Sequence, residues 1–195
     1  MTTPLLRSGS TAGRQPARER GATVWLTGLP SAGKSTLAAA LAERLRADGR
    51  RVEVLDGDEV REFLTAGLGF SKADRDTNIA RIGFVADLLA RNGVTVITAA
   101  IAPYADARAA VRARHERSGT PFLEVYVAAP VEVCAERDVK GLYAKQRAGE
   151  LTGLTGVDDP YEPPAAPELT LQTHEQSPAE SVEALMGALA GRGLA

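Results

Sequence analysis

One nine-residue segment, Gly28-Leu-Pro-Ser-Ala-Gly33-Lys34-Ser35-Thr36, has the residue types and the spacing that suit phosphate binding. Its glycines let a loop curl until backbone N–H groups point at phosphate oxygens. Lys34 would reach the β- and γ-phosphates, and the Ser35 hydroxyl could ligate Mg²⁺. A short apolar run over 23–27 precedes the segment, and a helical pattern rich in Ala and Leu follows it. This context predicts a P-loop that binds a nucleoside triphosphate, rather than a glycine-rich surface turn. The residues expected to bind it are Gly28, Pro30, Ser31, Ala32, Gly33, Lys34, Ser35 and Thr36.

Phosphoryl transfer also calls for an acidic residue at the end of a strand. Two strand-like runs, at 93–100 and 122–127, end without an acid, whereas the run that begins at Arg51 ends in Asp56-Gly57-Asp58. This placement favours a small-molecule kinase over a motor ATPase or a GTPase. We expect Asp58 to handle the proton of the acceptor, and Asp56 to support it or to bind Mg²⁺ through water. The alternative is that Asp58 only caps a helix over 59–64.

Cationic side chains are concentrated near the predicted loops at the strand ends, where open α/β sheets bind ligands. Arg61 lies one turn beyond Asp58, and Arg75 and Asn78 are one turn apart at the start of a long helical pattern. Each cation taken alone is more often a solvated surface charge. Four more cations surround a loop-like segment farther along the chain, namely Arg137, Lys140, Lys145 and Arg147.

The elements that must position these residues alternate along the chain. Strand-like runs at 23–27, 51–56, 93–100 and 122–127 are each followed by a helix or loop pattern. Such alternation predicts a parallel sheet covered on both faces. The first helix should run from 34 to 48 and stop at Gly49, and a longer one should run from about Asp74 to Arg91. We therefore expect an α/β protein with the P-loop NTPase fold, in three α/β/α layers around a central parallel sheet.

Length and composition indicate one domain. A chain of 195 residues suits a single α/β domain. The formal net charge of -2 provides no basic excess, so neither a nucleic acid nor a membrane surface is expected as a partner. The single cysteine, Cys134, allows no internal disulfide and favours a reducing cytoplasm. No apolar run is long enough to span a bilayer.

Two segments differ in composition from the rest. Residues 1–22 hold four arginines and a single acid, and we expect a flexible basic arm there. Residues 23–195 should form the kinase domain. Within it, the segment from about 138 to 167 is rich in Gly, Pro, Lys, Arg and Tyr, and is predicted to be a mobile lid. Ordered structure should resume at 168–171 and in an amphipathic tail over 178–189.

With these motifs in order, the chain resembles the adenylylsulfate kinase (APS kinase) family from about Thr23 to Thr173. The resemblance depends on the P-loop and on five later groups of residues, which are Asp56-Gly-Asp58-Glu-Val-Arg61; Leu68-Gly-Phe70-Ser71 with Asp74-Arg75 and Asn78-Ile-Ala-Arg81; Ile101-Ala-Pro-Tyr104; Val133-Cys-Ala-Glu-Arg137-Asp138-Val-Lys140-Gly-Leu-Tyr143; and Thr155-Gly156 with Asp159-Pro-Tyr-Glu162 and Pro167-Glu168.

The resemblance implies Mg²⁺-dependent transfer of the ATP γ-phosphate to the ribose 3′-hydroxyl of adenosine 5′-phosphosulfate (APS), which gives PAPS and ADP. It also implies a homodimer. Lys34 and Asp58 would be catalytic, Ser35 and Asp56 would bind Mg²⁺, and Arg137 would belong to the ATP site. Phe70 would stack on a purine, although it could instead be a core residue. The implied APS site comprises Asp58, Arg61, Phe70, Arg75, Asn78, Ile101, Ala102, Lys140, Gly153 and Leu154.

Two positions depart from the family pattern. Ala102 stands where the family often has a serine that is sometimes described as a phosphoserine intermediate, so we expect direct transfer to the acceptor. Leu154 replaces a phenylalanine that would close on the adenine of APS. This loss keeps open the alternative of a kinase for another adenosine derivative. A separate alternative, of a different class, is a catalytically silent nucleotide-binding module.

Overall fold

The computed structural model describes residues 20–195, so nearly all of the predicted basic arm lies outside the described residues. Five parallel strands form one sheet in the order β2-β3-β1-β4-β5. The parallel sheet predicted from the sequence is therefore confirmed. The strands are β1 (Ala22–Thr27), β2 (Val52–Asp56), β3 (Thr95–Ala99), β4 (Phe122–Ala128) and β5 (Leu169–Gln172).

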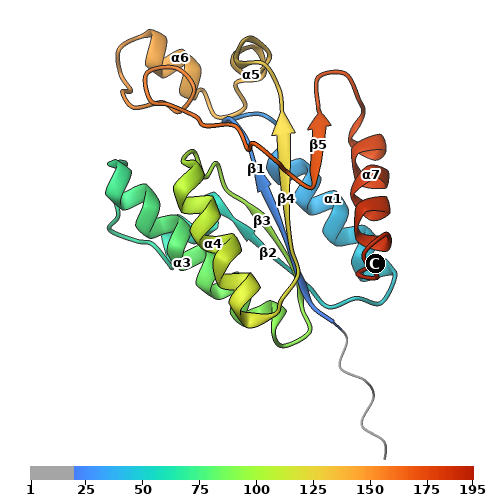
Figure 1. Ribbon diagram of the computed structural model, residues 1–195. Coiled ribbons are helices and arrows are strands. Elements are labelled where there is room, and N and C mark those ends of the chain that lie inside the picture. Colours follow the sequence, from blue (N-terminus) through green and yellow to red (C-terminus); the bar gives the residue numbers. More distant parts are fainter. Residues whose placement is uncertain (1–19) are drawn as a thin grey trace, which may run out of the picture.

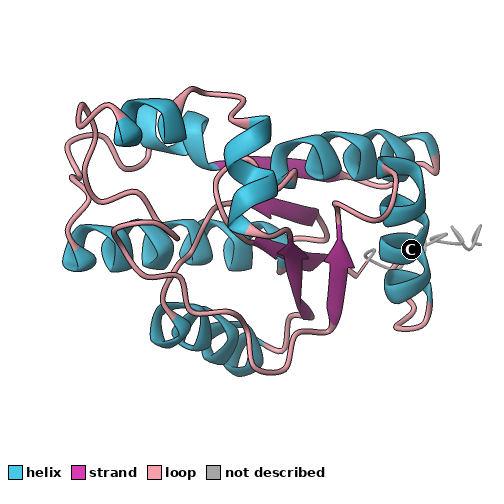
Figure 2. Ribbon diagram, turned by 90° about the horizontal axis from the view of Figure 1, so that it is seen from above, coloured by secondary structure: helices cyan, strands magenta, loops and turns pink. Residues whose placement is uncertain are grey.

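Helices cover both faces of the sheet, which confirms the three α/β/α layers (Figure 1). On one face lie α1 (Lys34–Ala47) and α7 (Pro178–Ala190), and on the other lie α3 (Lys72–Ala90) and α4 (Ala105–Ser118). Three short helices, α2 (Gly57–Glu62), α5 (Val131–Arg137) and α6 (Leu142–Arg147), follow strand ends or lie in the segment after β4. Figure 2 shows the same layers from above. No helix within residues 20–195 combines the length and the apolarity that a membrane crossing needs.

The central strand β1 joins two cores because alternate side chains of a strand point to opposite faces. Val24 and Leu26 belong to the larger core under α1 and α7, whereas Trp25 belongs to the smaller one under α3 and α4. All six residues of β1 are buried. The strand that leads into the P-loop is therefore fixed from both sides.

The helix boundaries agree with the sequence to within two residues. Helix α1 ends next to Gly49, whose φ of 82° is the left-handed conformation typical of a residue that follows a helix. Helix α3 starts at Lys72, two residues before the predicted Asp74, because Ser71 is its N-cap and accepts a hydrogen bond from the Asp74 backbone N–H.

A buried histidine joins α4 to the sheet. His115 is fully buried, with Nδ1 2.9 Å from the Val111 carbonyl oxygen and Nε2 2.9 Å from the Thr23 hydroxyl oxygen. A carbonyl can only accept, so Nδ1 donates to Val111, and in the neutral ring that burial favours Nε2 accepts from the Thr23 hydroxyl. Burial lowers the pKa of His115, against the opposing influence of the Asp87 carboxylate.

We expect the free energy of unfolding to fall as the pH drops below about 6.5, the ordinary pKa of histidine in an unfolded chain. In that range the unfolded state binds a proton that the buried ring does not bind, so acid favours unfolding. One pH unit below this pKa, the free energy of unfolding is lower by at most about 1.4 kcal/mol. Urea unfolding at pH 7.5 and pH 5.5 measures it. His115→Gln should remove this pH-dependent part of the free energy of unfolding, whereas His174→Gln should retain it. The same pH dependence in both variants would mean that His115 is not its source.

Candidate active site

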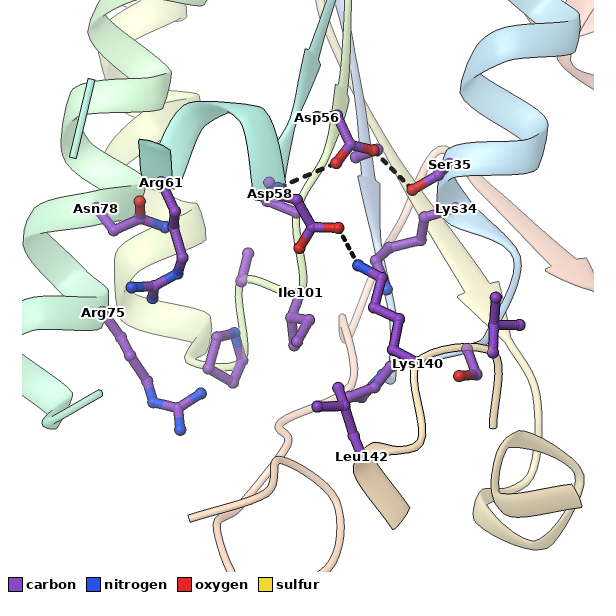
Figure 3. A pocket seen from close by; sticks show the side chains of 18 of the residues that line it. Lys34, Ser35, Asp56, Asp58, Arg61, Arg75, Asn78, Ile101, Lys140 and Leu142 are labelled. Carbon is purple, nitrogen blue, oxygen red and sulfur yellow. Dashed lines mark hydrogen bonds and ion pairs between the residues drawn. The ribbon is translucent and has the colours of Figure 1, made fainter. Parts of the chain in front are cut away.

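A cleft of about 390 Å³ lies at the carboxyl edge of the sheet. The P-loop forms one wall, α2 and α3 form the other, and the segment between α5 and α6 closes one side (Figure 3). Most of the site residues expected from the sequence meet here, namely Pro30, Ser31, Gly33, Lys34, Ser35, Thr36, Asp56, Asp58, Arg61, Phe70, Arg75, Asn78, Ile101, Ala102 and Lys140. Gly28, Ala32, Arg137, Gly153 and Leu154 are outside its lining.

The P-loop owes its shape to two glycines. A Cβ atom on Gly28 would lie 2.4 Å from the Val127 carbonyl oxygen, so a side chain would displace β4. Gly33 has a φ of 106° and forms the N-cap of α1, a conformation that L side chains rarely adopt. The loop therefore turns directly into the amino end of α1, where backbone N–H groups favour an anion.

The Lys34 ammonium lies inside this loop. Its Nζ donates hydrogen bonds to the carbonyl oxygens of Gly28 at 2.9 Å and of Leu29 at 2.7 Å. Burial lowers the pKa of Lys34 to about 8, which leaves the side chain mostly protonated at neutral pH. A positive charge held at the base of the cleft is well placed to attract phosphate oxygens.

Ser35 and two aspartates form a chain of hydrogen bonds beside Lys34 (Figure 3). The Ser35 hydroxyl donates to Asp56 Oδ2 at 2.6 Å, and Asp56 Oδ1 accepts from the Asp58 backbone N–H at 3.0 Å. Asp56 is thus the N-cap of α2, and the alternative that Asp58 caps this helix is wrong. The Asp58 carboxylate is instead free to pair with the Lys140 ammonium across the cleft.

The oxygens of Ser35 and Asp56 fit a magnesium ion. Hydroxyl and carboxylate oxygens are the hard donors that Mg²⁺ prefers, and the two side chains already lie within hydrogen-bond distance of each other. Within residues 20–195 no group of three or more His, Cys, Asp or Glu could hold a metal. Mg²⁺ does not need such a cage, because it binds through one or two protein oxygens together with phosphates and water.

The wall opposite the P-loop carries an aromatic ring and a buried amide. Phe70 is 66% exposed, so the alternative that it is a core residue is wrong. The Arg61 guanidinium carbon lies 4.5 Å from its ring centre. Asn78 is 7% exposed, and its Oδ1 is buried without a hydrogen-bond partner among the described residues. A buried acceptor that lacks a partner at a cleft wall suits a ligand that donates a hydrogen bond.

Arg75 makes more contacts within the protein than its position one turn before Asn78 predicts. Only 7% of the residue is exposed, and its guanidinium donates to the carbonyl oxygens of Phe70 at 2.8 Å and Gly153 at 2.7 Å. It also donates to the Thr155 hydroxyl at 2.8 Å and lies 3.4 Å from the Asp159 carboxylate. Arg75 therefore connects α3 to the segment 153–159, in addition to lining the cleft.

The segment 138–167 contains α6 and makes specific contacts with the P-loop and with itself. The Tyr143 hydroxyl donates to the Pro30 carbonyl oxygen at 3.1 Å. Leu154 is 5% exposed and belongs to the larger core, and the Asp158 carboxylate accepts from its backbone N–H at 2.6 Å and from that of Gly153 at 2.8 Å. These contacts explain why Gly153 and Leu154 are not in the lining.

Arg137 lies at the outer end of the P-loop. Its guanidinium donates to the carbonyl oxygens of Thr173 at 2.6 Å and of Ala32 at 3.4 Å. The side chain therefore links α5 to the loop after β5 beside the P-loop. Arg137 and Ala32 are next to the cleft without forming its lining.

Sequence reasoning missed two residues that contact the cleft walls from behind. Tyr143 was part of a motif but had no assigned role, and Arg108 was not singled out. A lone arginine in a helical pattern usually indicates a solvated surface charge. The burial of Arg108, at 2% exposure, depends on tertiary contacts that no local pattern reveals.

Comparisons with known proteins agree with this geometry. The adenylylsulphate kinase family matches residues 20–172. A probable adenylyl-sulfate kinase of Synechocystis sp. is 58% identical over 165 residues, which cover 85% of this chain and 91% of that protein. An adenylyl-sulfate kinase of Synechococcus sp. is 56% identical over 174 residues, or 89% and 97% of the two chains. The Mycobacterium tuberculosis APS kinase, solved in complex with AMPPNP and APS, superposes with a TM-score of 0.86 at 45% identity and covers 88% of this chain and 99% of its own. The chain therefore belongs to the adenylylsulphate kinase family.

Proposed function

We propose that this protein is an adenylyl-sulfate kinase, which transfers the γ-phosphoryl group of ATP to the ribose 3′-hydroxyl of APS and releases PAPS and ADP. The observation that carries the proposal is one continuous cleft at the carboxyl edge of the sheet. It joins Lys34 of the P-loop to Asp58 and to the buried amide of Asn78 on the opposite wall. Donor and acceptor can therefore share one continuous space. Phosphoryl transfer depends mainly on such positioning and on charge stabilisation.

On the donor side, Lys34 would bind the β- and γ-phosphates within the curled loop. Ser35 and Asp56 would hold Mg²⁺, the first directly and the second directly or through water. When bound, Mg²⁺ neutralises part of the charge on the phosphate oxygens. Arg137 would approach the nucleotide from outside the cleft lining.

On the acceptor side, we propose that Asp58 orients the 3′-hydroxyl and accepts its proton, since its carboxylate faces the cleft and is not used as a cap. Phe70 has an exposed ring on which a purine can stack. Arg61 and Asn78 would bind the phosphosulfate, because a guanidinium and an amide N–H₂ both donate to anionic oxygens, and the unpartnered Asn78 Oδ1 would accept from a donor group elsewhere on the nucleotide. The Ala102 side chain offers no nucleophile, so transfer would be direct.

We propose that residues 138–167 act as a lid over this acceptor. Val139, Lys140 and Leu142 of this segment line the cleft, and Lys140 reaches Asp58 on the far wall. The lid would exclude water from the γ-phosphate, which limits loss of the phosphoryl group to hydrolysis.

A panel of acceptors tests the proposed function. ADP release is measured by a coupled assay with APS, adenosine, AMP and sulfamoyl-adenosine as acceptors. We expect APS to give the highest kcat/KM. If APS were the poorest acceptor, the assignment would be wrong, and the second candidate function, a 3′-hydroxyl kinase for another adenosine derivative, would replace it. Leu154 is the observation that motivates this second candidate.

Leu154→Phe is expected to lower the KM for APS severalfold. A phenylalanine would restore one side of an aromatic sandwich around the adenine, which is worth about 1 kcal/mol. Because Leu154 packs in the larger core, this gain requires the residue to reach the base when the acceptor is bound. Initial rates at saturating ATP measure the KM, with Leu151→Phe in the same segment as the matched control. An unchanged or higher KM for APS would mean that position 154 does not touch the base.

We also propose that the protein acts as a homodimer in the cytoplasm. Two large apolar side chains, Phe84 and Leu88, lie exposed one turn apart on α3, at 47% and 42%. The lone thiol, Cys134, is buried and free, as expected for a reducing compartment. Light scattering coupled to gel filtration distinguishes a dimer from a monomer.

A further inference from the structure

Arg108 is a buried arginine on α4 that the proposed reaction does not use directly. Only 2% of the residue is exposed, yet each guanidinium nitrogen has a partner. Nη1 donates to the Ala102 carbonyl oxygen, Nη2 to the Glu162 carbonyl oxygen and Nε to Glu124 Oε1, all at 2.7 Å. These three partners come from the turn after β3, from the segment 138–167 and from β4. One side chain thus connects three parts of the chain that are distant in sequence.

The turn that Arg108 contacts has an unusual backbone. Ala102 is 2% exposed and has a φ of 48°, in the left-handed region that only glycine adopts without cost. Such a conformation persists only where neighbours determine it. Besides Arg108, the Thr27 hydroxyl holds this turn by donating to the Ile101 carbonyl oxygen at 2.6 Å. Residues 101–103 line the cleft, so the restrained turn is part of its wall.

The same contacts fix the turn relative to the lid segment. The Glu162 backbone N–H donates to the Pro103 carbonyl oxygen at 2.8 Å, and the Glu162 side chain accepts from the Ala105 backbone N–H at 2.7 Å. Arg108 donates to the carbonyl groups of Ala102 and Glu162. The turn and the lid segment therefore form one restrained unit behind the acceptor end of the cleft. The P-loop takes no part in these contacts.

We infer that Arg108 is a positioning residue for the acceptor. By holding the carbonyl groups of Ala102 and Glu162 together, it sets the position of the cleft wall at residues 101–103 without touching the substrate. This inference depends on the proposed function for the identity of the acceptor, and it concerns only that half of the cleft. ATP binding at the P-loop should not depend on Arg108.

Arg112 provides a matched comparison on the same helix. It lies one turn beyond Arg108 and shares the partner Glu124, at 3.3 Å, but its other partner is Glu168, at 2.7 Å. Both arginines therefore belong to one ion-pair network beside the sheet. Only Arg108 reaches the turn, so the two substitutions separate positioning of the cleft wall from stability of the network.

The test measures the KM for APS and the KM for ATP in Arg108→Lys, in Arg112→Lys and in the parent enzyme. A lysine keeps the charge but cannot supply the planar fork that reaches three partners. We expect Arg108→Lys to raise the KM for APS by about tenfold to a hundredfold and to leave the KM for ATP nearly unchanged, since small misplacements have effects of this size. Arg112→Lys should lower the melting temperature and leave both KM values near those of the parent. Equal changes in the two KM values, no change, or the same KM pattern in Arg112→Lys would overturn the inference.

A further variant, Thr27→Val, keeps the test decisive if Arg108→Lys folds poorly. This substitution removes the hydrogen bonds from the Thr27 hydroxyl to the carbonyl oxygens of Ile101 and Ala102 and should raise the KM for APS in the same selective way. Adding Ala102→Gly to Arg108→Lys should recover part of the lost affinity for APS, because glycine keeps the left-handed turn with less restraint. Strictly additive changes in that double variant would contradict a role through the turn.

The acceptor panel separates the failure of this inference from that of the proposed function. If the parent enzyme prefers another adenosine derivative, the proposed function fails, and the variants are compared with that acceptor instead. A selective rise in its KM in Arg108→Lys would then still support the positioning role.

Discussion

Lys34→Ala is expected to reduce ADP release to the background of the assay. The Lys34 ammonium is the cation at the base of the P-loop, where the charge of the transferring phosphoryl group would develop. Removal of one preorganised donor of this kind costs about 10² to 10³ in kcat, and the loss of a full charge should reach the upper end of that range or exceed it. Steady-state kinetics with ATP and APS measure the effect.

The control for this variant is Lys72→Ala. Lys72 is half exposed and pairs with Asp76 at 2.7 Å and Asp106 at 3.0 Å, outside the cleft lining. Its removal should change turnover little. Retention of most of the activity in Lys34→Ala would remove the P-loop from the mechanism. If instead the parent enzyme bound ATP but released no ADP with any acceptor, the protein would be a silent nucleotide-binding module.

The fold was predictable because its signals are local. The run over 23–27 has an apolar centre, Val24-Trp25-Leu26, as expected for a strand covered on both faces, and β1 occupies that position in the middle of the sheet. Gly33 and Gly49 mark the two ends of α1 through backbone conformations that favour glycine. One difference in a boundary, at the start of α3, comes from Ser71, a capping residue whose signal is also local but was not used.

The site was predictable only in part, because several roles depend on contacts between distant segments. Asp56 and Asp58 are two residues apart, and the sequence suggested only Asp58 as a possible helix cap. Which of them caps α2 follows from the direction in which the chain leaves β2. Arg75 contacts residues 153–159, and Arg108 contacts residues 102 and 162. These contacts join segments that no pattern in the sequence relates to each other. The burial of Leu154 has the same origin.

The cap assignment has a chemical consequence. With Asp56 bound to Ser35 and to the backbone of Asp58, the oxygens proposed to bind Mg²⁺ and the oxygens proposed to act on the acceptor belong to two different carboxylates. Lys140 approaches only the second one. The two halves of the reaction can therefore be perturbed separately.

Asp58→Asn is expected to lower kcat by about 10² to 10⁴ and to leave ATP binding nearly unchanged. Asparagine keeps the size of the side chain, but it cannot accept the hydroxyl proton, and general-base assistance has this magnitude. The helix should be preserved because its cap is the Asp56 side chain bonded to the backbone N–H of residue 58, which the substitution retains. The lost ion pair with Lys140 is largely exposed, so it should contribute little to stability.

Single-turnover rates and equilibrium ATP binding, measured on the same preparations, separate these two effects for Asp58→Asn. Glu59→Gln is the matched control, since Glu59 is an exposed acid of the same helical turn and is outside the cleft lining. A large drop in kcat for Asp58→Asn, without a drop for Glu59→Gln, would support proton transfer to the Asp58 carboxylate. Equal turnover in both variants would mean that the reaction needs neither the proton-accepting ability nor the charge of Asp58. Weaker ATP binding in Asp58→Asn would mean that Asp58 acts on the donor side of the cleft, the role proposed for Asp56.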